Sequence, residues 1–255
     1  MRKQLLEMAQ MVRSAAAALP LQERGRIMAM GADGTPTSYI DKVAEDVIVG
    51  YVDRNALRLN LLSEEAGFID RGFEETLVAD PIDGTHNACA GIPFYSVSLA
   101  VGKGSLSGMR EGLVMNLVTG DVFHASKGKG ATLNGAPIRM KKPEAEKLLI
   151  AYVGGTVDPV IYTIASRFKR VRCLGSTALE LCSVASGQAD AFFVKYQDLK
   201  KSPRIVDIAA AILVLREAGG EAYDENNEIL DMPLSLDERR NMFAAGSDEV
   251  RGLMG

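Results

Sequence analysis

The chain has 255 residues, of which 47% are hydrophobic and 24% charged, and its net charge is −4. This is the composition of an ordinary globular protein with one large domain or two small ones. It has neither the basic excess of a nucleic-acid-binding surface nor an apolar run near the ~20 residues of a membrane span. We therefore expect it to bind neither nucleic acid nor a membrane. The N-terminus leads into an amphipathic segment instead of an apolar signal core, which favours the cytoplasm.

The first half of the chain mixes helical and strand patterns. Apolar spacing predicts a helix over 4–19 and a second one that begins near Thr37 or Ser38. Between them, the glycines and proline of residues 31–36 indicate a loop. Short apolar runs bounded by turn residues predict strands. These strands are expected at 59–62, 76–79, 95–101, 111–117 and 121–125.

A polar, proline-marked stretch at 138–147 indicates a boundary between an N-terminal domain, 1–140, and a C-terminal domain, 141–255. Beyond it, strand and helix patterns alternate, as they do in an α/β layer. Strands are expected at 148–153, 170–174, 190–194, 220–223 and 241–245. Helices are expected at 158–167, 176–187, 204–218 and 247–254.

The most informative segment is Asp80-Pro81-Ile82-Asp83-Gly84-Thr85, which follows the predicted strand 76–79. Two carboxylates at a strand end, followed by glycine and threonine, suit an oxygen-ligated cation and a bound phosphate. A plain turn is the alternative, because Asp-Pro and Asp-Gly are common turn dipeptides. Two further acidic positions are suggestive: residues 63–65 end another strand, and Asp207 begins an apolar helix. The helix dipole alone would explain Asp207.

Histidine and cysteine are scarce. Only two histidines exist, so a metal would be bound by oxygen, which favours Mg²⁺ or Mn²⁺. The cysteines Cys89, Cys173 and Cys182 are too few and scattered for a disulfide framework or a zinc site. They are expected to be buried small hydrophobic residues.

Taken together, these segments resemble the inositol monophosphatase family. The matching motifs follow the family's order along essentially the whole chain, at 31–37, 40–41, 63–65, 80–85, 128–135, 174–178, 206–210 and 217–220. The first two look like the archaeal branch, whose members often act on both inositol phosphates and fructose 1,6-bisphosphate. The resemblance implies a layered αβαβα sugar-phosphatase fold of the α/β (α+β) class. It also implies a homodimeric, Mg²⁺-dependent phosphomonoesterase of small phosphate esters, with Mn²⁺ as a possible substitute.

The resemblance assigns roles to the matching residues. It implies two or three metal ions, held by Glu64, Asp80, Asp83, Asp207 and the carbonyl of Ile82. Thr85, with Asp41 behind it, would position or deprotonate the nucleophilic water, and Glu65 would support the metal shell or a water. Without the resemblance, Asp41 would be interpreted as helix N-terminal charge. The implied substrate contacts are Asp83, Gly84, Thr85, Arg172, Ser176, Thr177 and Lys195.

Some positions depart from the family pattern. Lys195 lies where the archaeal branch often has an arginine, and lysine binds phosphate only as a point charge. The neighbouring cations are Lys200, Lys201 and Arg204. Arg172 is equally well explained as a surface strand residue. Substrate identity therefore stays open between inositol or fructose phosphates and another small phosphate, such as a nucleotide 3′-phosphate.

Two other classes of protein are alternatives to a phosphatase. A catalytically silent homologue that acts as a binding protein would be expected to have lost a metal carboxylate, and all the matching acids are present. A dinucleotide-binding enzyme is excluded, because no Gly-x-Gly-x-x-Gly follows an early strand.

Overall fold

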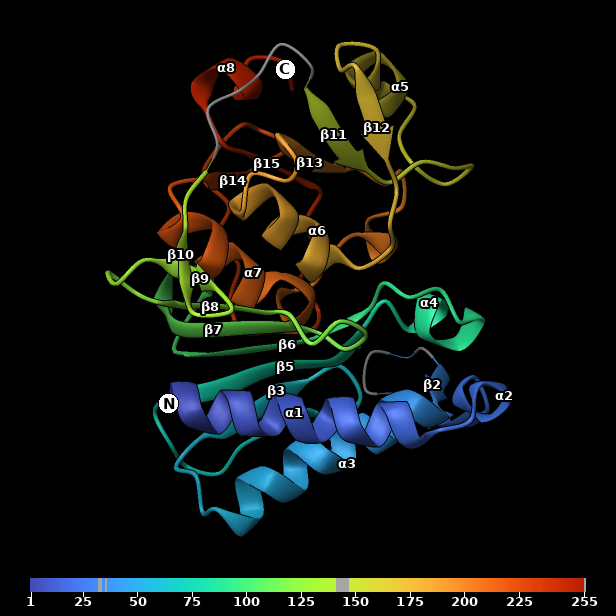
Figure 1. The fold of residues 1–255 in the computed structure, drawn as a ribbon, viewed down its shortest axis with the longest axis vertical. Helices are drawn as coiled ribbons and strands as arrows, with labels where there is room; N and C mark the ends of the chain where they lie inside the picture. The colour runs from blue at the N-terminus through green and yellow to red at the C-terminus, as the bar shows by residue number, and fades with distance from the viewer. Residues whose placement is uncertain (32–33, 35, 141–146, 255) are drawn as a thin grey trace.

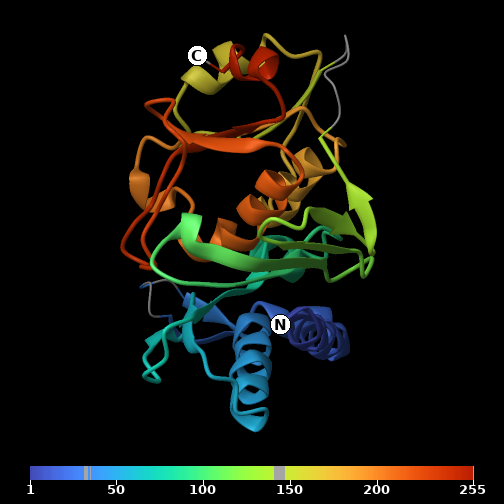
Figure 2. The same cartoon turned by 90° about the vertical axis from the view of Figure 1, so that its left-hand side faces the viewer.

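Two sheets and the helices on their faces form five layers (Figure 1). This computed structural model describes residues 1–31, 34, 36–140 and 147–254. Helices α1 and α3 cover the outer face of the larger sheet, α6 and α7 lie between the sheets, and α5 and α8 cover the smaller sheet (Figure 2). The predicted αβαβα order is confirmed. The helices are α1 (Arg2–Ala18), α2 (Leu21–Arg24), α3 (Tyr39–Arg54), α4 (Thr85–Ala90), α5 (Val160–Ala165), α6 (Thr177–Ala185), α7 (Ile205–Glu217) and α8 (Asp248–Arg251).

The larger sheet has eight strands in the order β10-β9-β8-β7-β6-β5-β3-β4. The β3–β5 pair is parallel, so the carboxyl ends of these two strands meet at one edge, with Ser63 beside Ala79. Two further strands, β1 (Ile27–Met30) and β2 (Pro36–Ser38), form a separate antiparallel pair. The strands of the larger sheet are β3 (Asn60–Ser63), β4 (Gly67–Ile69), β5 (Thr76–Asp83), β6 (Ser96–Gly102), β7 (Met109–Asn116), β8 (Val122–Ser126), β9 (Ala131–Leu133) and β10 (Ala136–Ile138).

The smaller sheet has five strands in the order β12-β11-β13-β15-β14. The first three are parallel and β15 pairs antiparallel with its neighbours, which gives the alternation of strands and helices predicted for this half. The strands are β11 (Leu148–Ala151), β12 (Arg170–Arg172), β13 (Ala191–Val194), β14 (Glu221–Asp224) and β15 (Met242–Ala245).

Helix α7 lies at the centre of the molecule. It is apolar on nearly all sides, as a helix enclosed between two sheets must be, and residues 208–212 are fully or almost fully buried. Its core cluster joins Val78 of the larger sheet to Phe192 of the smaller one. The domain division at 138–147 stays a prediction, and residues 141–146 of that stretch lie outside the described residues. Among the described helices, none is long and apolar enough to cross a lipid bilayer.

Two expectations from the sequence are wrong. Strand β5 does not end at Ala79 but continues to Asp83, with an irregular register against β6 between Asp80 and Asp83. Pro81 lies in this irregularity, where a residue without an N–H group is tolerated. Of the cysteines, only Cys182 is buried; Cys89 is half-buried and Cys173 is exposed.

Candidate active site

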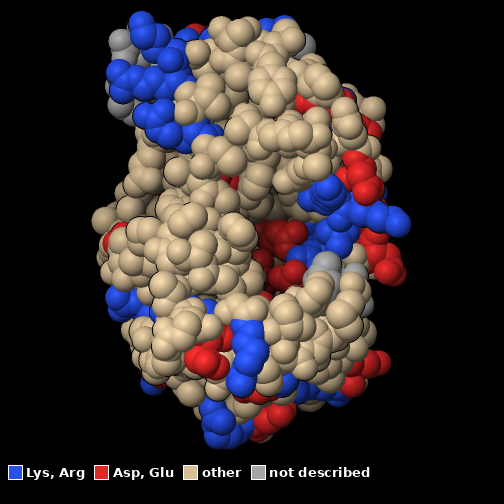
Figure 3. Space-filling view, turned by 90° about the vertical axis from the view of Figure 1, so that its right-hand side faces the viewer, with Lys and Arg blue, Asp and Glu red and all other residues tan. Residues whose placement is uncertain are grey.

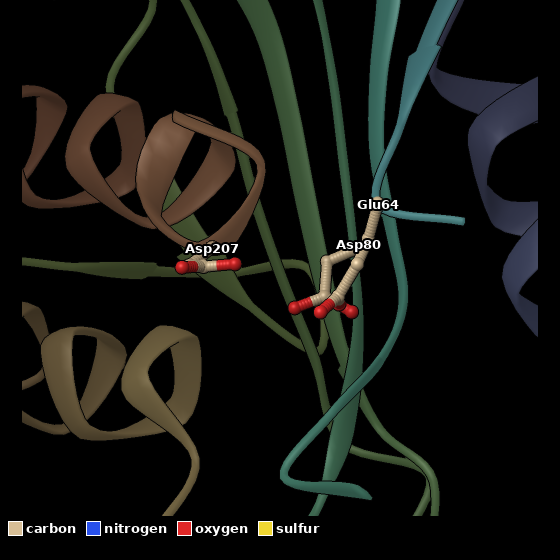
Figure 4. A group of neighbouring side chains, drawn as sticks. All are labelled: Glu64, Asp80 and Asp207. Atoms are coloured by element: carbon tan, nitrogen blue, oxygen red, sulfur yellow. The ribbon is translucent and has the colours of Figure 1, made fainter. Parts of the chain in front are cut away.

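Three carboxylates from distant parts of the chain converge between the larger sheet and α7 (Figure 4). Glu64 directly follows β3, Asp80 lies in β5, and Asp207 lies in the first turn of α7. One oxygen of each lies within 4.8 Å of the others. The parallel β3–β5 pairing brings Glu64 and Asp80 together, and the N-terminus of α7 presents Asp207 opposite them. We call these three residues the carboxylate cluster.

The carboxylate cluster is electrostatically costly. Asp80 is only 3% exposed, and burial, followed by the nearby carboxylates, raises its pKa well above the usual range. Burial also raises the pKa of Glu64 to about 8, although the Arg204 charge opposes the shift. A divalent cation would relieve this repulsion. The donor atoms are all carboxylate oxygens, so the cluster fits a hard cation such as Mg²⁺ or Mn²⁺.

Arg204 is a member of the site that sequence reasoning did not place there. Its Nη2 lies 2.5 Å from Glu64 Oε1 and 3.1 Å from Asp207 Oδ1. The signal available in the sequence was its position three residues before Asp207, at the N-cap of α7. Its contact with Glu64 depends on how β3 meets α7, which no local pattern reveals.

Asp83 lies beside the N-terminus of α6 and is not part of the carboxylate cluster. Its Oδ2 accepts hydrogen bonds from Ser96 Oγ at 3.1 Å, from Ser176 Oγ and from the Ala178 N–H at 2.9 Å. Its Oδ1 accepts one from the Thr177 N–H at 3.0 Å. Burial raises the pKa of Asp83 to about 6, against these bonds, which lower it. Asp83 therefore ties the larger sheet to α6.

The junction around Asp83 requires glycine at position 84. Gly84 has φ of +93°, and a Cβ there would lie 2.9 Å from the Gly175 carbonyl oxygen. Beside it, Asn87 Nδ2 donates to the carbonyls of Phe94 at 2.8 Å and Leu174 at 2.7 Å. The start of α4 thus contacts the loop before α6 directly.

Thr85 and Asp41 form a hydrogen-bonded pair next to this junction. Thr85 Oγ1 is 2.9 Å from both Asp41 Oδ1 and the Ile82 carbonyl, and its one hydrogen can serve one of them at a time. Asp41 also accepts from Ser38 Oγ at 2.6 Å, in the capping box that begins α3. Burial raises the pKa of Asp41. The first turn of α3 therefore holds Asp41 against Thr85.

Two more acids lie near the end of β3: Glu65 is half-buried and Glu45 is buried. Glu65 accepts a hydrogen bond from Thr37 Oγ1. Glu45 is buried one turn after Asp41 on α3, and burial raises its pKa to about 7, although the Ser63 hydroxyl opposes the shift. Asp33, the carboxylate of the 31–37 loop, lies outside the described residues.

The two basic residues proposed to contact substrate have other partners. Arg172 is exposed on the edge strand β12, and its Nη1 donates to the Val171 carbonyl at 2.8 Å. Lys195 is half-buried and pairs with Asp158 at 3.5 Å. Neither contact reaches the carboxylate cluster.

In the space-filling view, acidic side chains line a hollow in the surface and basic side chains flank one side of it (Figure 3).

Known proteins are similar to this chain in both sequence and fold. The model of the inositol monophosphatase family matches residues 2–251. A fructose-1,6-bisphosphatase/inositol-1-monophosphatase of Methanothermobacter thermautotrophicus is 40% identical over 243 residues, which cover 90% of this chain and 85% of that protein. A bifunctional NADP phosphatase/NAD kinase of Methanococcus maripaludis is 31% identical and covers 92% of this chain, but only 45% of that protein is matched.

Solved structures give the same result. One, described as an inositol monophosphatase-fructose 1,6 bisphosphatase, has a TM-score of 0.87 at 32% identity, with 99% of this chain and 97% of that chain covered. A Pyrococcus horikoshii protein described as similar to inositol-1 monophosphatase has a TM-score of 0.85 at 29% identity, with 99% and 96% covered. The family match and the shared fold agree along nearly the whole chain. This chain therefore belongs to the inositol monophosphatase family.

Proposed function

We propose that this protein is a metal-dependent phosphomonoesterase that hydrolyses inositol monophosphate, fructose 1,6-bisphosphate or both. The observation that carries the proposal is the carboxylate cluster beside the Thr85–Asp41 pair, in a chain whose relatives are named as such phosphatases. Two or three Mg²⁺ ions, or Mn²⁺, would be held by Glu64, Asp80, Asp83, Asp207 and the Ile82 carbonyl. When bound, the metal would polarise the phosphoryl oxygens and lower the pKa of a water.

The Thr85–Asp41 pair would orient the attacking water. If the Thr85 hydrogen points to Asp41, the lone pairs of Oγ1 remain free to accept a hydrogen bond from that water. The buried carboxylate of Asp41 can then take up the proton that the water releases through Thr85. Glu65, fixed by Thr37, would hold a second water or support the metal shell.

The substrate would lie against the junction between the two sheets. Backbone N–H groups at Gly84 and Thr85 would bind the phosphate, and Asp83, Ser176 and Thr177 would contact the sugar or inositol ring. Lys195 and Arg172 remain proposed contacts of a second anionic group. We also propose a homodimer located in the cytoplasm, as the family resemblance implies.

A second candidate substrate is a nucleotide phosphate such as NADP. The observation that favours it is the 31% identity to the bifunctional NADP phosphatase/NAD kinase, over the part of that protein that matches this chain. In both candidates the reaction is the same hydrolysis of a phosphate monoester.

Phosphate release by the purified protein tests the proposal. The substrates are inositol 1-phosphate, fructose 1,6-bisphosphate, NADP and adenosine 3′,5′-bisphosphate, each with Mg²⁺ and with EDTA. We expect EDTA-sensitive release from one or both of the first two. The Asp80→Asn variant, prepared in parallel, should release none and excludes a contaminating phosphatase. Release from NADP alone would favour the second candidate, and no release from any substrate would contradict the phosphatase proposal.

A further inference from the structure

A guanidinium group lies within the carboxylate cluster. Arg204 is 6% exposed, and its Nη2 contacts Glu64 Oε1 and Asp207 Oδ1 together. Its Nε lies 3.4 Å from Asp207 Oδ2, and its backbone N–H donates to the same oxygen at 2.8 Å. The Arg204 side chain therefore links an acid that follows β3 of the larger sheet to an acid of α7.

Arg204 and a metal ion would use the same two carboxylates, those of Glu64 and Asp207. Glu64 and Asp207 are two of the three acids whose oxygens lie within 4.8 Å of one another. The guanidinium keeps its positive charge in proteins, so it cannot be neutralised to make room for a second cation. A divalent ion held by these carboxylates would be repelled by Arg204 and would compete with it for their oxygen lone pairs.

We propose that Arg204 is an internal competitor of the metal. It neutralises Glu64 and Asp207 in the metal-free protein, and its side chain must withdraw from Glu64 when a metal binds there. Arg204 thereby stabilises the metal-free fold and weakens metal affinity. This inference rests on the proposed metal dependence. The capping of α7 would survive the withdrawal, because the backbone N–H of Arg204 bonds to Asp207 independently of the side chain.

If Arg204 competes with the metal, its removal must change both the stability of the metal-free protein and the affinity for metal. Removing the guanidinium leaves three crowded acids without their cation, so the metal-free protein should lose stability. The metal-bound protein should lose much less, because the metal supplies the missing positive charge. The same difference must appear as tighter metal binding.

The test compares wild type, Arg204→Met, Arg204→Lys and Arg216→Met. Arg216 lies on the same helix but pairs with Glu221 and the Leu230 carbonyl, so its loss should not alter metal affinity. Calorimetric titration with Mg²⁺ or Mn²⁺ gives the dissociation constant, and thermal unfolding is followed in EDTA and in saturating metal. We expect the dissociation constant of Arg204→Met to fall about tenfold or more. The unfolding temperature of Arg204→Met should fall in EDTA and stay near the wild-type value with metal. Arg204→Lys should give values between those of wild type and Arg204→Met.

Unchanged or weaker metal binding in Arg204→Met would overturn the inference, because it would mean that Arg204 orients the carboxylates without leaving them. If that variant folds only with metal, it is purified with Mg²⁺ and metal loss to a chelator is timed. Release slower than from wild type is expected, and faster release would overturn the inference. If the wild-type protein binds no metal at all, the proposed function itself fails, which is a different result from equal binding by wild type and variant.

Discussion

Glu180 is a fully buried carboxylate that lies apart from the carboxylate cluster. Its Oε1 accepts hydrogen bonds from the N–H groups of Leu174 at 2.8 Å and Gly175 at 3.0 Å, so it fixes the loop that leads into α6. Its Oε2 has no hydrogen-bond partner within the described part of the chain. Burial raises the pKa of Glu180 to about 7, against the two amide bonds, which lower it. Glu180 thus supports the Ser176 region at a cost that depends on pH.

This cost predicts how the free energy of unfolding changes with pH. In the unfolded chain, the Glu180 carboxyl loses its proton near its ordinary pKa of 4.5. Between there and about 7 the folded protein holds the extra proton, so stability falls as pH rises. Glu180→Gln removes this loss. Near pH 8 the variant should be more stable than wild type by up to about 3 kcal/mol, and the advantage should disappear below about pH 4.5.

Urea unfolding across this pH range measures the difference between wild type and Glu180→Gln. Glu180→Ala is the control for the loop contacts, because it removes the acceptor of both amide bonds and should be less stable at low pH. If the free energies of unfolding of wild type and Glu180→Gln differ by a constant amount from about pH 4 to 8, the raised pKa of Glu180 is contradicted.

At the scale of elements, the contact between α4 and the loop before α6 depends on glycine. Gly84 and Gly72 both have positive φ, +93° and +76°, but nothing lies within 4 Å of a Cβ at Gly72. The free energy of unfolding of Gly72→Ala should therefore fall by about 1–2 kcal/mol, the cost of a left-handed alanine alone. Gly84→Ala should lose more, because the Gly175 carbonyl must also move. Denaturant unfolding of both variants separates the two effects. An equal decrease in the free energy of unfolding would show that the Gly175 carbonyl moves without measurable cost.

The elements that the sequence predicts well are the long helices. Helices α1 and α3 carry enough turns for the apolar spacing to be clear, and Ser38 marks the start of α3. Helix α7 is apolar on nearly all sides, and the length of its apolar run indicates a helix. The strands β1, β2, β4, β9 and β10 were not predicted. Each has only three or four residues, too few to show an alternation, and β1 has no buried side chain. The continuation of β5 past Pro81 was also missed, because a proline at a strand irregularity has the same local pattern as a turn.

The candidate site divides in the same way. The hexapeptide of β5 draws attention to Asp80 and Asp83 by itself. The local pattern makes Glu64 and Asp207 only suggestive, and their assignment as metal ligands and the role of Asp41 come from the family resemblance. The contact of Arg204 with Glu64 joins residues 140 positions apart in the sequence. It arises from the packing of α7 against the larger sheet, and a tertiary contact of this kind leaves no local signal in the chain.

At the scale of the whole molecule, the two predicted domains share their core. The cluster that contains Val78 and Ala100 of the larger sheet also contains Ile208 of α7 and Phe192 of the smaller sheet. Helix α7 packs against strands β5 to β8 on one side and against α6 and β14 on others. Neither half can bury its apolar face without the other, so their stabilities should not be independent.

We therefore expect the two halves to unfold together. Calorimetry of the metal-free protein should show one transition, with a calorimetric enthalpy equal to the van't Hoff enthalpy. A fragment of residues 1–140 should fail to fold, because the face of the larger sheet that α7 covers would meet water. Its circular dichroism and denaturant response, compared with those of the full chain, measure this directly. Two separate transitions, or a cooperatively folded 1–140 fragment, would instead support the division at 138–147 and would make the α7 interface a contact between independent domains.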